Sequence, residues 1–125
     1  MPNRLRVLVV DDHPGIVKAL SRLLSAAGHD VVGGITDFTT VPEAVQELEP
    51  HVVVLDVNLK SVDGIEVCRR IIHSSPGVKV IVFTAADDSD IRQRAREAGA
   101  VDFVDKRALD GDLLSAIKRL AAGPG

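Results

Sequence analysis

The sequence predicts an α/β fold with a doubly wound, five-stranded parallel sheet and five helices. Short runs rich in β-branched residues are apolar throughout, which is typical of parallel strands that are covered on both faces. Between these runs, apolar residues recur at helical spacing, so strand and helix alternate along the chain. A chain of 125 residues with 46% hydrophobic content is long enough for one domain core and too short for two domains of ordinary size.

The expected elements follow one another without internal repeats. The strands are the apolar runs at residues 5–10, 29–35, 52–55, 78–83 and 101–104. The helices are the periodic segments at residues 14–27, 41–48, 89–98 and 109–120, and a third helix is marked by apolar residues from 65 to 72 and ends near Pro76-Gly77. Pro14 fits the first turn of the first helix and Gly28 fits its end. Gly33 and Gly34 indicate a turn or bulge, because no further glycine or lysine completes a phosphate-binding loop.

The composition excludes several functions. A net charge of −3 and a pI near 5.7 do not suit a protein that grips nucleic acid by neutralising phosphates. No apolar run is as long as a membrane span, and the N-terminus lacks the apolar region of a signal peptide. Cys68 is the only cysteine and is expected to pack in the core. With no internal disulfide, we expect a soluble, cytoplasmic protein.

Polar residues directly follow four of the expected strands. Ligand sites in parallel α/β sheets lie beyond the carboxyl ends of the strands, so these residues are expected to meet: Asp11, Asp12, Asp56, Thr84 and Lys106. Three neighbouring carboxylates repel one another unless a cation compensates them, and their oxygens suit Mg²⁺. Lys106 and Thr84 suit the oxygens of a phosphoryl group. The sequence therefore predicts a site that receives a phosphoryl group on a carboxylate.

With these residues, the sequence resembles the receiver domains of two-component response regulators over essentially its whole length. The resemblance makes Asp11 and Asp12 the acidic pair, Asp56 the phosphoacceptor, Thr84 the switch hydroxyl and Lys106 the conserved lysine of that family. Asp63-Gly64 matches the opening of the third helix, and Phe103 matches the aromatic switch position. The resemblance implies a CheY-like sheet of strand order 2-1-3-4-5. Residues 1–122 would form the receiver domain, and residues 123–125 would begin a linker or end the chain.

The resemblance also implies a mechanism. Asp56 would take a phosphoryl group from the phosphohistidine of a histidine kinase or phosphotransfer protein, a reaction that serves signalling rather than a separate enzymatic activity. Mg²⁺ would be held by the carboxylates of Asp11, Asp12 and Asp56 and by the backbone carbonyl of Asn58. Thr84 would then move toward the phosphate and Phe103 would turn inward, which changes the surface of the fourth helix, fifth strand and fifth helix.

The output is suggested by the ends of the chain. The Asp-Asp-His-Pro opening at residues 11–14 and the ending at residues 116–123 resemble receivers that precede LuxR- or NarL-type helix-turn-helix domains. This implies control of transcription through a DNA-binding domain outside this chain, with homodimer formation on phosphorylation as a further expectation. The alternative is a stand-alone regulator that acts by protein-protein contact.

The sequence departs from the family pattern at two places. Leu59-Lys60 stands where Met-Pro is common, which affects the shape of that loop. Arg107 stands where a proline often follows the lysine. A non-proline cis bond costs roughly 2.5–4 kcal/mol, so the Lys106–Arg107 bond is predicted to be trans, with the Lys106 ammonium still within ion-pair distance of Asp56.

Other functions fit these residues less well. A hydrolase of the haloacid dehalogenase type needs a second aspartate two residues after the nucleophile, where this chain has Asn58. A flavodoxin-like flavin protein needs a glycine-rich phosphate loop, where Asp11 and Asp12 would repel phosphate. A receiver without phosphorylation would not need all five site residues. His13 is interpreted as a loop residue, and the arginines at 92, 94 and 96 as a solvated helix face.

Overall fold

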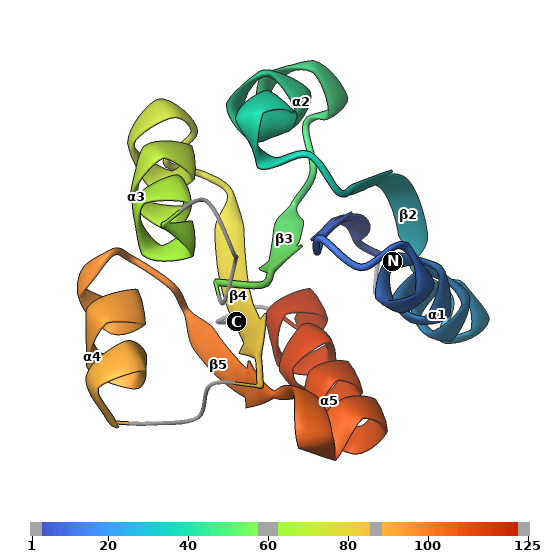
Figure 1. Cartoon of the computed structure of the whole chain (residues 1–125). Helices are drawn as coiled ribbons and strands as arrows, with labels where there is room; N and C mark the ends of the chain where they lie inside the picture. Colours follow the sequence, from blue (N-terminus) through green and yellow to red (C-terminus); the bar gives the residue numbers. More distant parts are fainter. Residues whose placement is uncertain (1–3, 58–62, 86–88, 123–125) are drawn as a thin grey trace.

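One parallel sheet forms the centre of the molecule (Figure 1). The computed structural model describes residues 4–57, 63–85 and 89–122. Within them, the strands lie side by side in the order β2-β1-β3-β4-β5. Their bounds are β1 (Arg6–Val10), β2 (Asp30–Ile35), β3 (Val52–Leu55), β4 (Lys79–Thr84) and β5 (Asp102–Asp105). The predicted fold class and strand order are confirmed.

Five α-helices connect and flank the strands. They are α1 (Pro14–Ala26), α2 (Val41–Leu48), α3 (Gly64–Ser74), α4 (Ser89–Glu97) and α5 (Leu109–Ala122). The predicted ends of α1, α2 and α4 differ from these bounds by at most one residue. Helix α3 ends at Ser74, shortly before the predicted stop near Pro76-Gly77, and α5 runs two residues further than predicted. The sequence analysis did not foresee two 3₁₀ turns, η1 (Phe38–Thr40) and η2 (Lys106–Ala108), which are single-turn connections of the kind common beside helix ends.

Each face of the sheet is covered by its own set of helices. Alternate side chains of a strand point to opposite faces. In β3, Val53 and Leu55 therefore pack in one core with residues of α2, α3 and α4, whereas Val52 and Val54 pack in a second core with residues of α1 and α5. Because helices cover both faces of the sheet, side chains on both faces are buried. The strands therefore need apolar residues at every position, which explains the unbroken apolar runs in the sequence.

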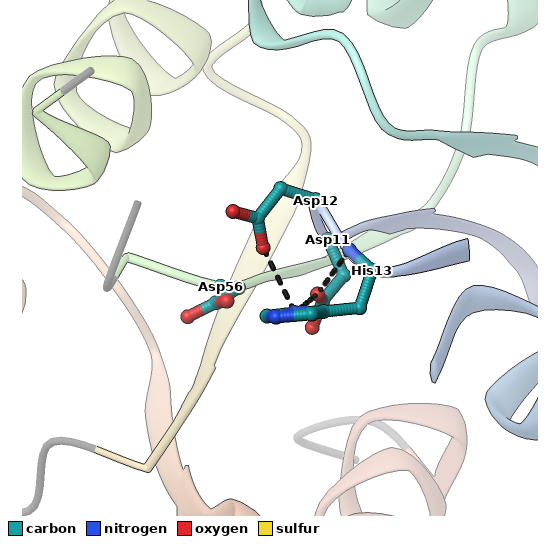
Figure 2. A group of neighbouring side chains, drawn as sticks. All are labelled: Asp11, Asp12, His13 and Asp56. Atoms are coloured by element: carbon teal, nitrogen blue, oxygen red, sulfur yellow. Dashed lines mark hydrogen bonds and ion pairs between the residues drawn. The ribbon is translucent and has the colours of Figure 1, made fainter. Parts of the chain in front are cut away.

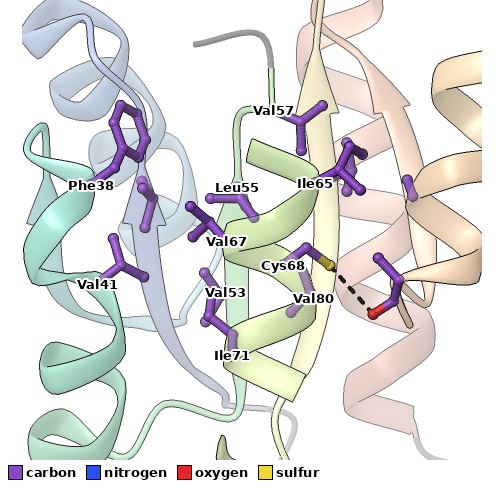
Figure 3. Packing of buried hydrophobic residues seen from close by; sticks show 14 of the residues in the cluster. Phe38, Val41, Val53, Leu55, Val57, Ile65, Val67, Cys68, Ile71 and Val80 are labelled. Carbon is purple, nitrogen blue, oxygen red and sulfur yellow. Dashed lines mark hydrogen bonds between the residues drawn. The ribbon is translucent and has the colours of Figure 1, made fainter. Parts of the chain in front are cut away.

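Cys68 lies in the first of these cores, as predicted. Its side chain is fully buried on α3 among valines and isoleucines, and its Sγ faces the Ala98 carbonyl at 4.0 Å (Figure 3). Burial raises the pKa of the Cys68 thiol to about 11, against the opposing charge of Arg69. The thiol is therefore protonated at neutral pH, which removes the thiolate that redox or nucleophilic chemistry needs.

The pairing of β1 with β2 contains the predicted irregularity. The register shifts between Val7 and Leu8, so that Val7 pairs with Val31 and Leu8 pairs with Gly33, which leaves an extra residue in β2. Gly34, the next residue, packs so closely on Val17 of α1 that a Cβ there would overlap the valine side chain. Gly33 therefore lies directly after a bulge in β2, and Gly34 allows α1 to pack closely on the strand.

No helix in the described part of the chain is long and apolar enough to cross a membrane.

Candidate functional site

Two strand ends bring carboxylates to the same edge of the sheet. Asp11 follows β1 and Asp56 follows β3, and both residues are buried, with 1% of their surface exposed. The Asp11 N–H donates to the Ile35 carbonyl at 3.0 Å, and the Asp56 N–H donates to the Val10 carbonyl at 3.0 Å. Each aspartate is thus held by one more hydrogen bond that extends the strand pairing. Their positions are fixed by the sheet rather than by a mobile loop.

Lys106 pairs with both carboxylates from the end of β5, the outermost strand of the sheet. It directly follows β5, and its Nζ lies 2.7 Å from Asp11 Oδ2 and 3.0 Å from Asp56 Oδ2. Burial disfavours the ammonium, but hydrogen bonds and charge from Asp11 and Asp56 outweigh that effect and raise the pKa of Lys106. The lysine is therefore a permanent cation at neutral pH. The ion pair with Asp56 is as the sequence predicted.

Contacts of Arg107 hold the turn that places Lys106 at the site, where related sequences often have a proline. The Lys106–Arg107 bond is trans as predicted, since the described residues contain no cis peptide bond. The Arg107 N–H, which a proline would lack, donates to Asp105 Oδ1 at 2.8 Å. The Arg107 guanidinium also pairs with Asp105, with Nη2 at 2.5 Å from Oδ2. These contacts hold the short turn η2 directly after β5.

Thr84 and Phe103 lie on β4 and β5, the two strands that follow β3 in the order of the sheet. Thr84 is the last residue of β4 and is fully buried. Phe103 lies in the middle of β5, opposite Val82 in the register, and is half-buried. The Arg92 guanidinium of α4 stacks over the Phe103 ring, 4.5 Å from its centroid. The sequence analysis anticipated the positions of both residues, but it treated Arg92 only as part of a solvated face.

Asp12 and His13 complete the group of side chains around Asp56 (Figure 2). His13 Nδ1 lies 2.9 Å from Asp11 Oδ1 and 2.9 Å from Asp12 Oδ1. The sequence analysis left His13 out of the site. The only signal available was its position next to two acidic residues, and adjacency alone does not say where a side chain points.

The donor atoms of this group fit a metal ion. One ligand atom from each of Asp11, Asp12, His13 and Asp56 lies within 4.8 Å of all the others. Asp11 Oδ2 and Asp12 Oδ1 are buried, and the groups beside them are Lys106 Nζ at 2.7 Å and His13 Nδ1 at 2.9 Å, so one ammonium stands against three carboxylates. Buried carboxylate oxygens need compensation, and a bound cation supplies it. Asn58, whose carbonyl the sequence analysis expected as a further ligand, lies outside the described residues.

Asp63 and Gly64 hold the start of α3 in place. The Asp63 carboxylate caps the helix by accepting hydrogen bonds from the N–H groups of Ile65 at 3.0 Å and Glu66 at 3.4 Å. Gly64 lies so close to the backbone of Val57, the residue after Asp56, that a Cβ there would overlap it. The Asp-Gly pair therefore serves as a cap followed by a close contact. Leu59 and Lys60 lie outside the described residues.

Comparison with known proteins identifies the family. Residues 7–118 match the response regulator receiver domain. This chain is a response regulator receiver domain. The receiver is 32% identical to the response regulator GacA of Pseudomonas aeruginosa over 120 residues, which cover 95% of this chain and 56% of that protein.

Solved structures show the same similarity. A two-component response regulator of the LuxR family from Aurantimonas superposes with a TM-score of 0.89 at 31% identity, covering 96% of this chain and 86% of that one. The BeF3-activated receiver domain of DrrB superposes with a TM-score of 0.82 at 33% identity, covering 95% and 98% of the two chains. The receiver described here spans about half the length of curated relatives such as GacA, at 56% of that protein.

Proposed function

We propose that Asp56 of this receiver accepts a phosphoryl group from a phosphohistidine and that Mg²⁺ is required for the transfer. The observation that carries the proposal is the position of Lys106, whose Nζ contacts both Asp11 Oδ2 at 2.7 Å and Asp56 Oδ2 at 3.0 Å. One fixed cation therefore stands beside the carboxylate at the end of the central strand, next to a group of donors that suits a metal ion. Such an arrangement stabilises the charge on transferring phosphoryl oxygens.

Three carboxylates would hold the metal ion. Asp11, Asp12 and Asp56 offer oxygen ligands, which Mg²⁺ prefers, and their number against one lysine leaves negative charge for it to balance. When bound, Mg²⁺ lowers the electrostatic repulsion between the Asp56 carboxylate and the incoming phosphoryl oxygens.

The protein groups have separate roles in the proposed transfer. An Asp56 carboxylate oxygen attacks phosphorus, the phosphorus–nitrogen bond of the phosphohistidine breaks with its electron pair leaving on nitrogen, and the leaving imidazole takes up a proton from water. Lys106 stays charged throughout and pairs with a phosphoryl oxygen in the acyl phosphate, since its raised pKa favours the ammonium. Asp11 is held by Lys106 and by the His13 N–H, at 2.9 Å from Oδ1, so it stays in place as a ligand.

The proposed response to phosphorylation runs through Thr84 and Phe103. The Thr84 hydroxyl would move to the phosphoryl group, and Phe103 would fill the space toward the strand end. Phe103 is only half-buried and is covered by Arg92 of α4, so its inward movement would change the surface of α4 and β5. A partner that binds this surface then distinguishes the two states.

Intact-mass measurement with a small donor tests the assignment of Asp56. Phosphoramidate carries a phosphorus–nitrogen bond like that of phosphohistidine, so with Mg²⁺ it should add one phosphoryl group to the receiver. Asp56→Asn should remove the labelling, and a chelator should suppress it in the unchanged chain. Asp30→Asn is the matched control, because Asp30 begins β2 at the opposite edge of the sheet and should label normally. Full labelling of Asp56→Asn would contradict the proposal.

We further propose that the complete protein is cytoplasmic, takes its signal from a histidine kinase or phosphotransfer protein and regulates transcription through a helix-turn-helix domain. The similarity to a LuxR-family regulator and the greater length of GacA support this output. The coding sequence beyond Gly125 tests it. A helix-turn-helix pattern there is expected, whereas a stop codon would favour the alternative of a stand-alone regulator. Sedimentation of the labelled and unlabelled receiver tests the accompanying expectation of a phosphorylation-dependent homodimer.

A further inference from the structure

The turn after β5 is organised around one carboxylate, that of Asp105. Asp105 is the last residue of β5 and pairs with Thr84 in the register of the sheet. Its Oδ1 accepts hydrogen bonds from the Arg107 backbone N–H at 2.8 Å and from Arg107 Nε at 3.0 Å. Its Oδ2 accepts from Arg107 Nε at 3.1 Å and from Nη2 at 2.5 Å. The carboxylate therefore holds both the backbone and the side chain of Arg107, and Lys106 lies between the two residues.

The turn needs these contacts because Arg107 does not restrict its own backbone. A proline fixes φ through its ring, whereas an arginine leaves φ free and brings a backbone N–H that needs an acceptor. Asp105 supplies that acceptor and also binds the guanidinium, whose fork geometry suits a carboxylate. The Asp105 side chain is 15% exposed and the Arg107 side chain is 72% exposed. The carboxylate is thus anchored at the end of the strand, and the guanidinium closes over it from the solvent side.

The position of the Lys106 ammonium depends on this turn. The Lys106 side chain is 16% exposed, and its Nζ lies 2.7 Å from Asp11 Oδ2 and 3.0 Å from Asp56 Oδ2. Its Nζ also lies 5.8 Å from the centroid of the Phe83 ring, which is buried in the core. These three neighbours lie on or directly after strands of the sheet, whereas the Lys106 backbone belongs to η2. The turn is therefore the part of the chain that sets how the ammonium reaches the fixed carboxylates.

We propose that Asp105 and Arg107 are positioning residues for phosphoryl transfer, because their pairing holds the Lys106 ammonium beside the transferring phosphoryl oxygens. The proposal rests on the function proposed above and adds two residues that act through Lys106. A misplacement of about 1 Å in a reacting arrangement can slow the reaction by roughly a hundredfold. Loss of one of the two partners is therefore expected to slow the transfer while the sheet and the acidic group keep their structure.

A direct electrostatic role of Arg107 makes a different prediction. If the exposed guanidinium only attracts the anionic phosphodonor, removing the Asp105 carboxylate leaves more positive charge beside the site, so the transfer becomes faster. If the pair positions Lys106, removing either partner slows the transfer. Removing both then adds little to the effect of one, because the two residues act as a unit. The two roles differ in the sign of the effect of Asp105→Ala.

Time courses of phosphoramidate labelling at saturating Mg²⁺, followed by the intact mass of the 125-residue chain, separate these roles. We expect Asp105→Ala and Arg107→Ala each to slow labelling by about tenfold, and the double variant to stay within about twofold of the slower single variant. Asp105→Asn keeps an oxygen acceptor for the Arg107 N–H and should recover part of the lost rate. An Asp105→Ala chain that labels as fast as the unchanged chain, or faster, would overturn the proposal.

Arg119→Ala is the matched control for these rates. Arg119 forms an exposed ion pair with Asp102, at 2.7 Å, and Asp102 is the first residue of β5, at the end of the strand opposite Asp105. The variant therefore removes an arginine from an ion pair of the same strand without touching the turn η2. It should label at the rate of the unchanged chain. A loss of rate in Arg119→Ala equal to that in Arg107→Ala would overturn the specific role of the turn.

Fluorine NMR of the beryllofluoride adduct gives a readout of geometry rather than rate. Beryllofluoride with Mg²⁺ mimics the phosphoryl group on Asp56, and the fluorine beside Lys106 is the signal that moves most in Lys106→Ala. This signal should shift in Asp105→Ala and Arg107→Ala and stay in place in Arg119→Ala. Unshifted signals in both turn variants would overturn the positioning role.

The labelling experiment also keeps the two proposals apart. Labelling of the unchanged chain with no loss of rate in Asp105→Ala overturns only the role of the turn. No labelling of the unchanged chain overturns both proposals, because Asp105 and Arg107 can position Lys106 only for a transfer that takes place.

Discussion

At the scale of single residues, the site combines excess negative charge with burial. Asp11, Asp12 and Asp56 lie within 4.8 Å of one another, whereas Lys106 is the ammonium that contacts two of them, at 2.7 and 3.0 Å. Like charges at such distances repel, and the repulsion is strongest where water is excluded. The metal-free receiver therefore stores electrostatic strain that a bound cation relieves.

This charge balance predicts that Asp12→Asn stabilises the metal-free receiver. At an effective dielectric constant near 20, the relief of repulsion is worth about 1–3 kcal/mol in the free energy of unfolding. Urea unfolding in the presence of a chelator measures it, with Asp30→Asn as the control at the other edge of the sheet. Mg²⁺ should stabilise the unchanged chain more than the variant, because a ligand that binds only the folded state adds to its stability. A variant that is less stable than the unchanged chain in chelator would contradict the repulsion argument.

Thr84 allows phosphorylation to be separated from the response to it. The Thr84 hydroxyl is fully buried at the end of β4 and is proposed to respond to the phosphoryl group rather than to transfer it. Thr84→Ala should therefore accept the phosphoryl group from phosphoramidate, while the amide NMR signals of α4 and β5 change far less than in the unchanged chain. Thr84→Ser keeps the hydroxyl and should retain the response. Full α4 and β5 shifts in phosphorylated Thr84→Ala would refute the proposed role.

At the scale of elements, α4 is the helix with the least apolar character, and its packing depends on long polar side chains. Among the described residues of α4, Ala95 is buried, and Arg92, Arg94 and Arg96 are exposed, as the sequence analysis expected. Exposure does not make them equivalent, however. Arg94 lies 3.7 Å from Asp63 at the start of α3, whereas Arg92 stacks on Phe103 of β5. The two arginines tie α4 to different neighbours.

The Arg92 stack is expected to hold Phe103 in its outward position. Cation–π contacts at exposed sites are worth about 0.5–1 kcal/mol, so Arg92→Ala should increase the inward population of Phe103 by roughly two- to fivefold in the unphosphorylated receiver. NMR of ¹³C-labelled phenylalanine rings measures this population. Arg96→Ala removes an exposed arginine from the same helix and is the matched control. Equal Phe103 signals in the two variants would show that the stack does not bias the switch.

At the scale of the whole molecule, the edge of the sheet opposite the site contains a histidine that couples stability to pH. The Leu5 N–H donates to His29 Nδ1 at 3.2 Å, and burial lowers the pKa of His29 from its ordinary value of 6.5. Because the folded pKa lies below the unfolded one, the unfolded chain binds more protons as the pH falls. The stability from neutral His29 is therefore complete above pH 6.5 and is lost as the pH falls through the folded pKa.

His29→Asn should flatten this pH dependence. The asparagine Oδ1 can replace Nδ1 as the acceptor for the Leu5 N–H, but it does not titrate in this range. Urea unfolding midpoints measured from neutral to mildly acidic pH should fall less steeply in the variant than in the unchanged chain. His73→Asn changes an exposed histidine and should keep the original slope. Identical slopes for the unchanged chain and His29→Asn would contradict the coupling.

The sequence by itself determined the elements, the fold class and the edge at which the polar residues meet. Burial on both faces of a parallel sheet requires unbroken apolar strands, and helices on those faces require apolar residues at helical spacing, so both signals are local and can be recognised along the chain. Asp56 and Lys106 were identified as neighbours for the same reason, since Asp56 directly follows one apolar run and Lys106 lies one residue beyond the end of another. The bounds of α2 and β3 agree with the expected ranges to the residue.

Only the tertiary structure decided which side chains meet within that edge and how closely. The ion pair between Lys106 and Asp56 joins residues 50 apart in sequence, and its length of 3.0 Å depends on strand register and on the turn that Asp105 and Arg107 form. The stack of Arg92 on Phe103 and the turn of His13 toward Asp11 and Asp12 are likewise settled by side-chain direction. Residue type and spacing encode burial, whereas direction follows from the packing of elements that are distant in sequence.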